Sequence, residues 1–127
     1  MKKIAFICVH NSCRSQIAEA FGKKLLAGLY ECYSAGTETK HQINRDAVRL
    51  MKEHYNIDMS DQYCKLFDDI PEADIYVSMG CNVVCPYVSG KINVNWGLDD
   101  PTGKDDETFM NIISKIEQNI IALKNEE

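Results

Sequence analysis

The chain alternates short apolar runs with stretches whose apolar residues recur every three or four positions. Residues 4–9 form an apolar run of the kind that predicts a buried parallel strand. Residues 30–35, 75–77 and 92–96 predict three further strands. Helical spacing predicts three helices, with apolar faces made by Ile17, Ala18, Phe21 and Leu25, by Ala47, Val48, Met51 and Tyr55, and by Phe109, Ile112, Ile113, Ile116, Ile120 and Leu123.

The order of these elements is typical of an α/β protein. The predicted order is strand, helix, strand, helix, strand, strand, helix. This order predicts a three-layer fold with a four-stranded, mostly parallel sheet flanked by helices. Asn44 is a candidate N-cap of the second helix, and the acidic residues 105–107 suit the start of the last. Ligands in such folds bind beyond the carboxyl ends of the strands. Those ends are followed here by residues 8–15, 36–43, 80–90 and 96–104.

Length and composition predict a single domain spanning residues 1–127. Hydrophobic residues make up 45% of the 127 residues and charged residues 26%, which is ordinary for a globular protein and predicts no membrane span. Lys and Arg number 14 against 19 Asp and Glu, a net charge of −5. A basic nucleic-acid binder is therefore not expected, and any anion site must be built locally.

The chain has six cysteines, which is the unusual feature of its composition. Lys2 and Lys3 precede an apolar run that stops at His10, and this run is shorter than the apolar region of a signal peptide. We therefore expect a cytoplasmic protein. In that reducing compartment, clustered cysteines are more often catalytic, redox-active or metal-binding than structural.

Residues 8–15 form a candidate oxyanion-binding loop between the first strand and the first helix. Cys8 and Arg14 are separated by five residues, and a loop of that length can wrap its backbone N–H groups around a tetrahedral oxyanion. Arg14 can bind two oxygens as a fork, and Ser15 can donate to a Cys8 thiolate. The loop donors would come from Val9, His10, Asn11, Ser12, Cys13 and Arg14. The alternative is a buried cysteine at a strand end and a surface arginine.

Asp100, which precedes Pro101, is a candidate general acid. Proline restrains the residue before it to extended conformations, which fixes how Asp100 projects. A carboxylic acid placed over the loop could protonate a departing oxygen. From these residues alone, an ordinary Asp-Pro turn is the favoured interpretation, and the general acid is preferred only together with the loop of residues 8–15 and the family resemblance given below.

Cys81 and Cys85 are a candidate redox pair. Two cysteines four residues apart on a helical turn have Cα atoms about 6 Å apart, which is within disulfide reach. The alternative is two small buried hydrophobic residues. A nucleophilic cysteine in the same chain favours a redox role.

A metal site is a third interpretation of the cysteines. Cys8, Cys13, Cys81, Cys85 and His10 could form a tetrahedral zinc centre. Their spacing matches no regular zinc ribbon or finger, and the neighbouring Arg14 disfavours a cation. We therefore predict no metal ion bound by these residues.

Residues 8–15, together with Ala18 and Glu19, resemble the low-molecular-weight tyrosine phosphatase family and, within it, the arsenate reductases. The resemblance runs from residue 3 to the last helix. Gln16 stands where the phosphatases usually have proline. Thr102 and Gly103 stand where a tyrosine pair usually follows the Asp-Pro of the phosphatases.

The resemblance implies arsenate reduction through a relay of three cysteines. Cys8 would attack arsenate, Cys81 would release arsenite, and Cys85 would close an exposed disulfide. The gap between Cys81 and Cys85 is shorter than in the best-known thioredoxin-coupled branch. The resemblance also implies a monovalent cation near Asn11, Glu19 and Ser34.

We therefore expect a monomeric arsenate reductase that binds arsenate or a phosphate-like oxyanion. It would have no tightly bound cofactor and would use an external thiol reductant, with thioredoxin as the expected donor. The alternative is a phosphatase that uses Cys8, Arg14 and Asp100 with water as the second nucleophile. A non-enzymatic redox sensor or arsenical-binding protein is the third possibility.

Overall fold

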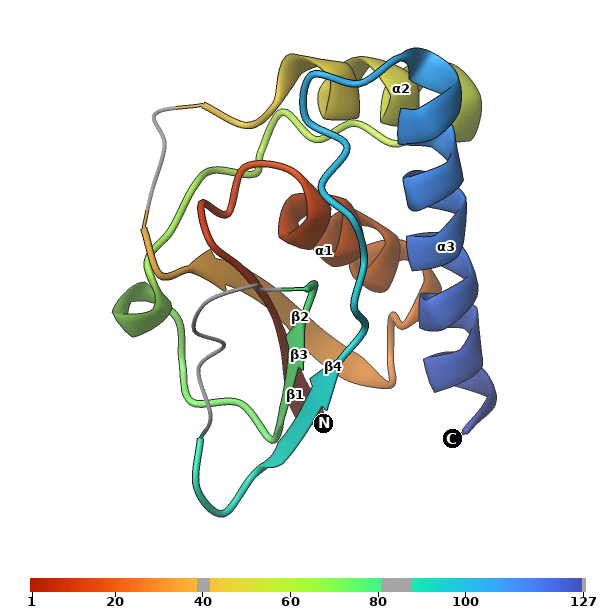
Figure 1. Cartoon of the computed structure of the whole chain (residues 1–127). Coiled ribbons are helices and arrows are strands. Elements are labelled where there is room, and N and C mark those ends of the chain that lie inside the picture. Colours follow the sequence, from red (N-terminus) through yellow and green to blue (C-terminus); the bar gives the residue numbers. More distant parts are fainter. Residues whose placement is uncertain (39–41, 81–87, 127) are drawn as a thin grey trace.

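The computed structural model describes residues 1–38, 42–80 and 88–126 (Figure 1). The described elements are β1 (Lys2–Cys8), α1 (Arg14–Leu25), β2 (Tyr30–Gly36), α2 (Arg45–Tyr55), a short 3-10 helix η1 (Phe67–Asp69), β3 (Ile75–Ser78), β4 (Ile92–Asn95) and α3 (Asp106–Asn125). The predicted order of strands and α-helices is confirmed. The 3-10 helix η1 was not predicted.

The four strands form one sheet in the order β2-β1-β3-β4, and every pair is parallel. Strand β1 lies between β2 and β3, with Cys8 paired with Gly36 and Ile7 paired with Ser78. The predicted α/β class with a parallel sheet is confirmed. Because β1 is central, the loop that follows it lies where the carboxyl ends of three strands meet.

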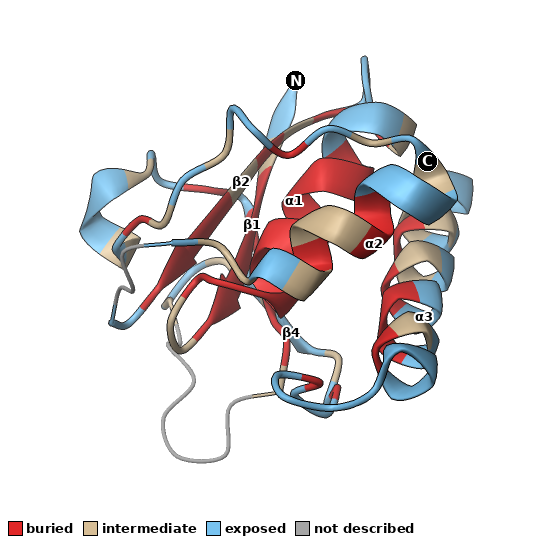
Figure 2. Cartoon of the chain, turned by 90° about the horizontal axis from the view of Figure 1, so that it is seen from above, coloured by how far each residue is buried: buried red, intermediate tan, exposed pale blue. Residues whose placement is uncertain are grey.

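The two faces of the sheet are covered differently, which gives three layers. Side chains alternate along a strand, so Ile4 and Phe6 face the helices while Ala5 and Ile7 face the other way. Helix α1 packs directly against the first face and is buried over most of its length (Figure 2), and α2 and α3 pack against α1. The segment containing η1 packs against the second face.

Helices α2 and α3 begin where the sequence predicts, and each has a capping side chain, of which only the Asn44 cap was predicted. The Asn44 side chain accepts a hydrogen bond from Ala47 N at 3.1 Å, and the Asp105 side chain accepts one from Thr108 N at 2.9 Å. Helix α1 has no side-chain cap at Cys13. Among the described residues, no helix is long and apolar enough to cross a membrane.

Gly80 allows the segment around Leu98 to lie against the end of β3. Its φ angle is +124°, and a Cβ atom there would lie 2.5 Å from Leu98 O and 2.8 Å from Leu98 N. Leu98 N donates to Met79 O at 2.8 Å. This close approach brings the residues that follow Leu98 beside the loop after β1.

Substitution Gly80→Ala tests this approach. We expect the free energy of unfolding to fall by about 1–3 kcal/mol more than in Gly90→Ala, because overpacking adds to the backbone strain. Gly90 is the matched control, since its φ is +80° but a Cβ atom there would meet nothing within 4 Å. Urea unfolding of both variants makes the comparison. Equal losses would show that the contact with Leu98 is unimportant.

Candidate active site

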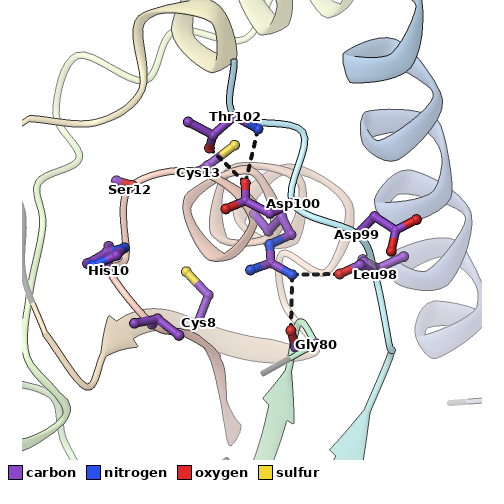
Figure 3. A pocket seen from close by; sticks show the side chains of 11 residues that line it. Cys8, His10, Ser12, Cys13, Gly80, Leu98, Asp99, Asp100 and Thr102 are labelled. Carbon is purple, nitrogen blue, oxygen red and sulfur yellow. Dashed lines mark hydrogen bonds between the residues drawn. The ribbon is translucent and has the colours of Figure 1, made fainter. Parts of the chain in front are cut away.

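A cavity of about 310 Å³ lies between the loop after β1 and the segment that precedes α3. The predicted groups Cys8, Arg14 and Asp100 all line this cavity, although they come from different parts of the chain. Its lining residues are Cys8, Val9, His10, Ser12, Cys13, Arg14, Gly80, Leu98, Asp99, Asp100 and Thr102 (Figure 3). Asn11 and Ser15 lie beneath it, both fully buried.

Cys8 ends β1 and is 4% exposed. Its Sγ lies 2.8 Å from Ser15 Oγ. Asn11 Nδ2 donates to the same Ser15 oxygen at 2.8 Å. A thiolate has no proton to give, so with Cys8 ionised the Ser15 hydroxyl is the donor. Ser15 is therefore placed to donate to a Cys8 thiolate, as the sequence predicts.

The loop is held in shape by Asn11. Its backbone has a φ of +51°, in the left-handed region that asparagine tolerates better than most residues. The Asn11 Oδ1 atom accepts hydrogen bonds from Gln16 Nε2 and from Lys65 N, both at 2.8 Å. Gln16 Nε2 also lies 3.0 Å from Asn11 O. The sequence singled out neither Lys65 nor a positioning role for Gln16.

The N-terminus of α1 opens at this loop. Because Cys13 provides no side-chain cap, the first N–H groups of the helix and its positive dipole end suit an anion. Burial, and to a smaller extent the charges of Asp100 and Cys8, raise the pKa of Cys13 to about 12. Cys13 is therefore a neutral thiol near pH 7.

Arg14 joins the two sides of the cavity. Its Nη1 atom donates to Leu98 O at 2.5 Å and lies 3.3 Å from Gly80 O and 3.4 Å from Met79 O (Figure 3). The side chain is 8% exposed. All of its hydrogen bonds to the described residues use Nη1, which leaves Nη2 and Nε as donors for an oxyanion.

Asp100 is held by the residue two positions after it. Its Oδ1 atom accepts hydrogen bonds from Thr102 N at 3.0 Å and from Thr102 Oγ1 at 2.7 Å. These bonds fix the carboxyl group beside the loop that carries Cys13 (Figure 3). His10, at the edge of the cavity, lies 3.2 Å from Glu38 Oε2 through its Nε2 atom. Sequence analysis gave no role to Thr102 or Glu38.

The other predicted residues fall outside this geometry or are arranged differently. Cys81 and Cys85 lie outside the described residues. Ser34 Oγ donates to Glu19 Oε1 at 2.5 Å, whereas Lys65 lies between Asn11 and Glu19 and bonds to both. Within residues 1–38, 42–80 and 88–126, no cluster of His, Cys, Asp or Glu could hold a metal ion.

The comparison with known families identifies the family of the chain. The family model described as low molecular weight phosphotyrosine protein phosphatase matches residues 3–126. The chain belongs to this family. The resemblance that the loop residues suggested is thereby confirmed over almost the whole chain.

Several members of the family that are similar to this chain are named arsenate reductases. The arsenate reductase of Brevibacillus brevis is 43% identical over 120 residues, which cover 91% of this chain and 88% of that protein. A solved arsenate reductase in the phosphate-binding state is 34% identical, with a TM-score of 0.89, and the match covers 99% of this chain and 98% of that one. The thioredoxin-dependent arsenate reductase of Corynebacterium glutamicum is 32% identical, with a TM-score of 0.82, over 99% of this chain and 61% of that one.

Alkylation by iodoacetamide at pH 7 tests the assignment of the loop. We expect Cys8 to react before Cys13, because the raised pKa of Cys13 leaves almost no thiolate there. Inorganic phosphate should slow the reaction of Cys8 by occupying the cavity. Peptide mapping by mass spectrometry identifies the modified residue, and Cys8→Ser is the control. Alkylation of Cys8 that ignores phosphate would contradict an oxyanion site at this loop.

Proposed function

We propose that the protein is an arsenate reductase that converts arsenate to arsenite. The observation that carries the proposal is that Cys8, Arg14 and Asp100 line one cavity at the open N-terminus of α1. A thiol, an anion-binding loop and an acid are the groups needed to attack a tetrahedral oxyanion. Relatives named arsenate reductase at 43% identity support arsenate as the substrate.

In the first step, Cys8 attacks arsenic and a hydroxyl group leaves. The oxyanion lies in the loop of residues 8–14, where backbone N–H groups and the guanidinium of Arg14 bind its oxygens. The Cys8 sulfur forms a bond to arsenic while Asp100 protonates the departing oxygen, which leaves as water. The Ser15 hydroxyl donates a hydrogen bond to the Cys8 thiolate before attack, which holds the sulfur below the substrate.

In the second step, arsenic is reduced by two electrons. The Cys81 thiolate attacks the Cys8 sulfur and the sulfur–arsenic bond breaks, so the electron pair stays on arsenic and arsenite leaves. A disulfide between Cys8 and Cys81 is the oxidised product. The Cys85 thiolate then attacks Cys81, which frees Cys8 and moves the disulfide to Cys81 and Cys85. The roles of Cys81 and Cys85 rest on the sequence, since both lie outside the described residues.

An external thiol donor restores the two cysteines for the next cycle. We take thioredoxin as this donor, because a similar solved structure is named a thioredoxin-dependent arsenate reductase. We also place the protein in the cytoplasm, where thioredoxin keeps thiols reduced. We propose that it acts there as a single-domain monomer.

The second candidate is hydrolysis of phosphate monoesters, which the family description favours. The same three groups would act, and water would release phosphate from Cys8. Gln16, which replaces the proline usual in phosphatases, is fully buried and hydrogen-bonds Asn11 and Tyr63 O. Thr102, in place of the usual tyrosine, binds Asp100 rather than offering an aromatic wall to a phosphotyrosine.

Asp100→Asn should slow arsenite formation while leaving oxyanion binding intact. The amide keeps the shape of the carboxyl group but has no proton to give to the departing oxygen, so a loss of about a hundredfold is expected. Single-turnover arsenite release measures the chemical step, and phosphate protection of Cys8 measures binding. Asp99→Asn is the matched control, since Asp99 also lines the cavity. A larger loss in the control would move the acid to Asp99.

Cys85→Ser should complete one turnover and stop. About one arsenite per chain would be released and a disulfide between Cys8 and Cys81 would remain, because no third thiol attacks it. Cys81→Ser should stop earlier, before arsenite leaves. Arsenite release and non-reducing peptide mapping distinguish the two variants.

The same two variants separate the reductase from the phosphatase. Hydrolysis needs no electrons, so neither Cys81→Ser nor Cys85→Ser should change the rate of aryl phosphate hydrolysis by more than a few-fold. Repeated turnover by Cys85→Ser, with thioredoxin as the sole reductant, would contradict the three-cysteine relay.

A further inference from the structure

A buried ion pair lies beneath the active-site loop. Lys65 is 8% exposed and Glu19 is 3% exposed, and Lys65 Nζ lies 3.3 Å from Glu19 Oε1. The ammonium also donates to Tyr63 O at 2.8 Å and lies 4.6 Å from the centroid of the Tyr63 ring. Burying two charges costs free energy that is offset only when both are well bonded, and here both are.

The backbone of Lys65 connects this ion pair to the nucleophile. Lys65 N donates to Asn11 Oδ1 at 2.8 Å, Asn11 Nδ2 donates to Ser15 Oγ at 2.8 Å, and Ser15 Oγ lies 2.8 Å from the Cys8 sulfur. On its other side, Lys65 O accepts from Gly36 N at 2.9 Å, at the end of β2. Residue 65 is therefore fixed by its side chain to Glu19 and by its backbone to both the loop and the sheet.

We propose that Lys65 is a positioning residue whose ammonium serves as the internal cation of the active-site loop. By holding residue 65 against Glu19, the ammonium fixes the N–H group that orients Asn11, and Asn11 in turn directs Ser15 toward Cys8. The effect on arsenate turnover rests on the proposed function. The effect on the reactivity of Cys8 does not.

The same geometry argues against the monovalent cation that the resemblance implies near Asn11, Glu19 and Ser34. Glu19 Oε1 already accepts from Ser34 and faces the Lys65 ammonium, and Asn11 Oδ1 accepts from Gln16 and Lys65. A positive charge on a side chain thus stands beside the oxygens that would bind the ion. The activity should therefore not depend on added potassium or sodium.

Glu19 offers a matched control, because a second lysine contacts its other oxygen. Lys23 Nζ lies 2.5 Å from Glu19 Oε2, and the Lys23 side chain is 55% exposed. Lys65→Met and Lys23→Met change the net charge equally and each removes one partner of the same carboxylate. Methionine at position 65 keeps the backbone N–H, so the comparison isolates the ammonium.

The experiment measures alkylation of Cys8 at pH 7, and arsenate turnover, in potassium, sodium or choline chloride at equal ionic strength. In Lys65→Met, we expect iodoacetamide to alkylate Cys8 about tenfold more slowly than in the wild type. This is the effect expected from weakening one charge-assisted hydrogen bond, that from Ser15 to the Cys8 thiolate. Potassium or sodium, but not choline, should restore part of that rate. Lys23→Met and the wild type should stay within about twofold of each other in every salt.

Each outcome decides the proposal. Unchanged Cys8 alkylation in Lys65→Met, or a wild type activated more than about twofold by potassium relative to choline, would overturn it. If Lys65→Met does not fold, the salt dependence of the wild type still decides. If the wild type does not reduce arsenate but Cys8 is still alkylated slowly in Lys65→Met, the proposed function is rejected. The positioning role of Lys65 is then still supported.

Discussion

The active site depends on the hydrogen bonds of one fully buried side chain, that of Asn11. Its left-handed backbone turns the loop after β1 back toward α1, and its side chain bonds to three residues at once. Because the Asn11 oxygen accepts from Gln16 and Lys65, its nitrogen faces Ser15, whose oxygen lies 2.8 Å from the Cys8 sulfur. The position of the Cys8 sulfur is thus set by the side chains of Asn11 and Ser15, which lie outside the lining of the cavity.

A second constraint brings Asp100 and Cys8 to the same cavity. Arg14 begins α1 and hydrogen-bonds backbone carbonyls at the end of β3 and at Leu98. Gly80 has no side chain, and a Cβ atom at this position would clash with the backbone of Leu98. Arg14 therefore holds the loop that carries Cys8 and the segment that carries Asp100 as opposite walls of one cavity, and we propose that the same guanidinium binds the oxyanion.

Sequence patterns predicted the fold well because apolar periodicity and capping are local. Residues only a few positions apart determine the start of α2 at Asn44, the acidic start of α3 and the order of the elements. Cys8, Arg14 and Ser15 could be found for the same reason. The contact of Lys65 with Glu19 spans 46 residues, so no local pattern reveals it. Lys65 stands between Cys64 and Leu66, and nothing in these neighbours signals that the end of the sheet will bury its charged side chain against Glu19.

The central claim is that the thiols of this chain supply the electrons that convert arsenate to arsenite. The most direct measurement mixes the reduced protein with excess arsenate and no reductant, and counts both arsenite formed and thiols remaining after denaturation. The account predicts one arsenite for each pair of thiols lost. Intact thiols and no arsenite, from a protein that hydrolyses aryl phosphate, would contradict it.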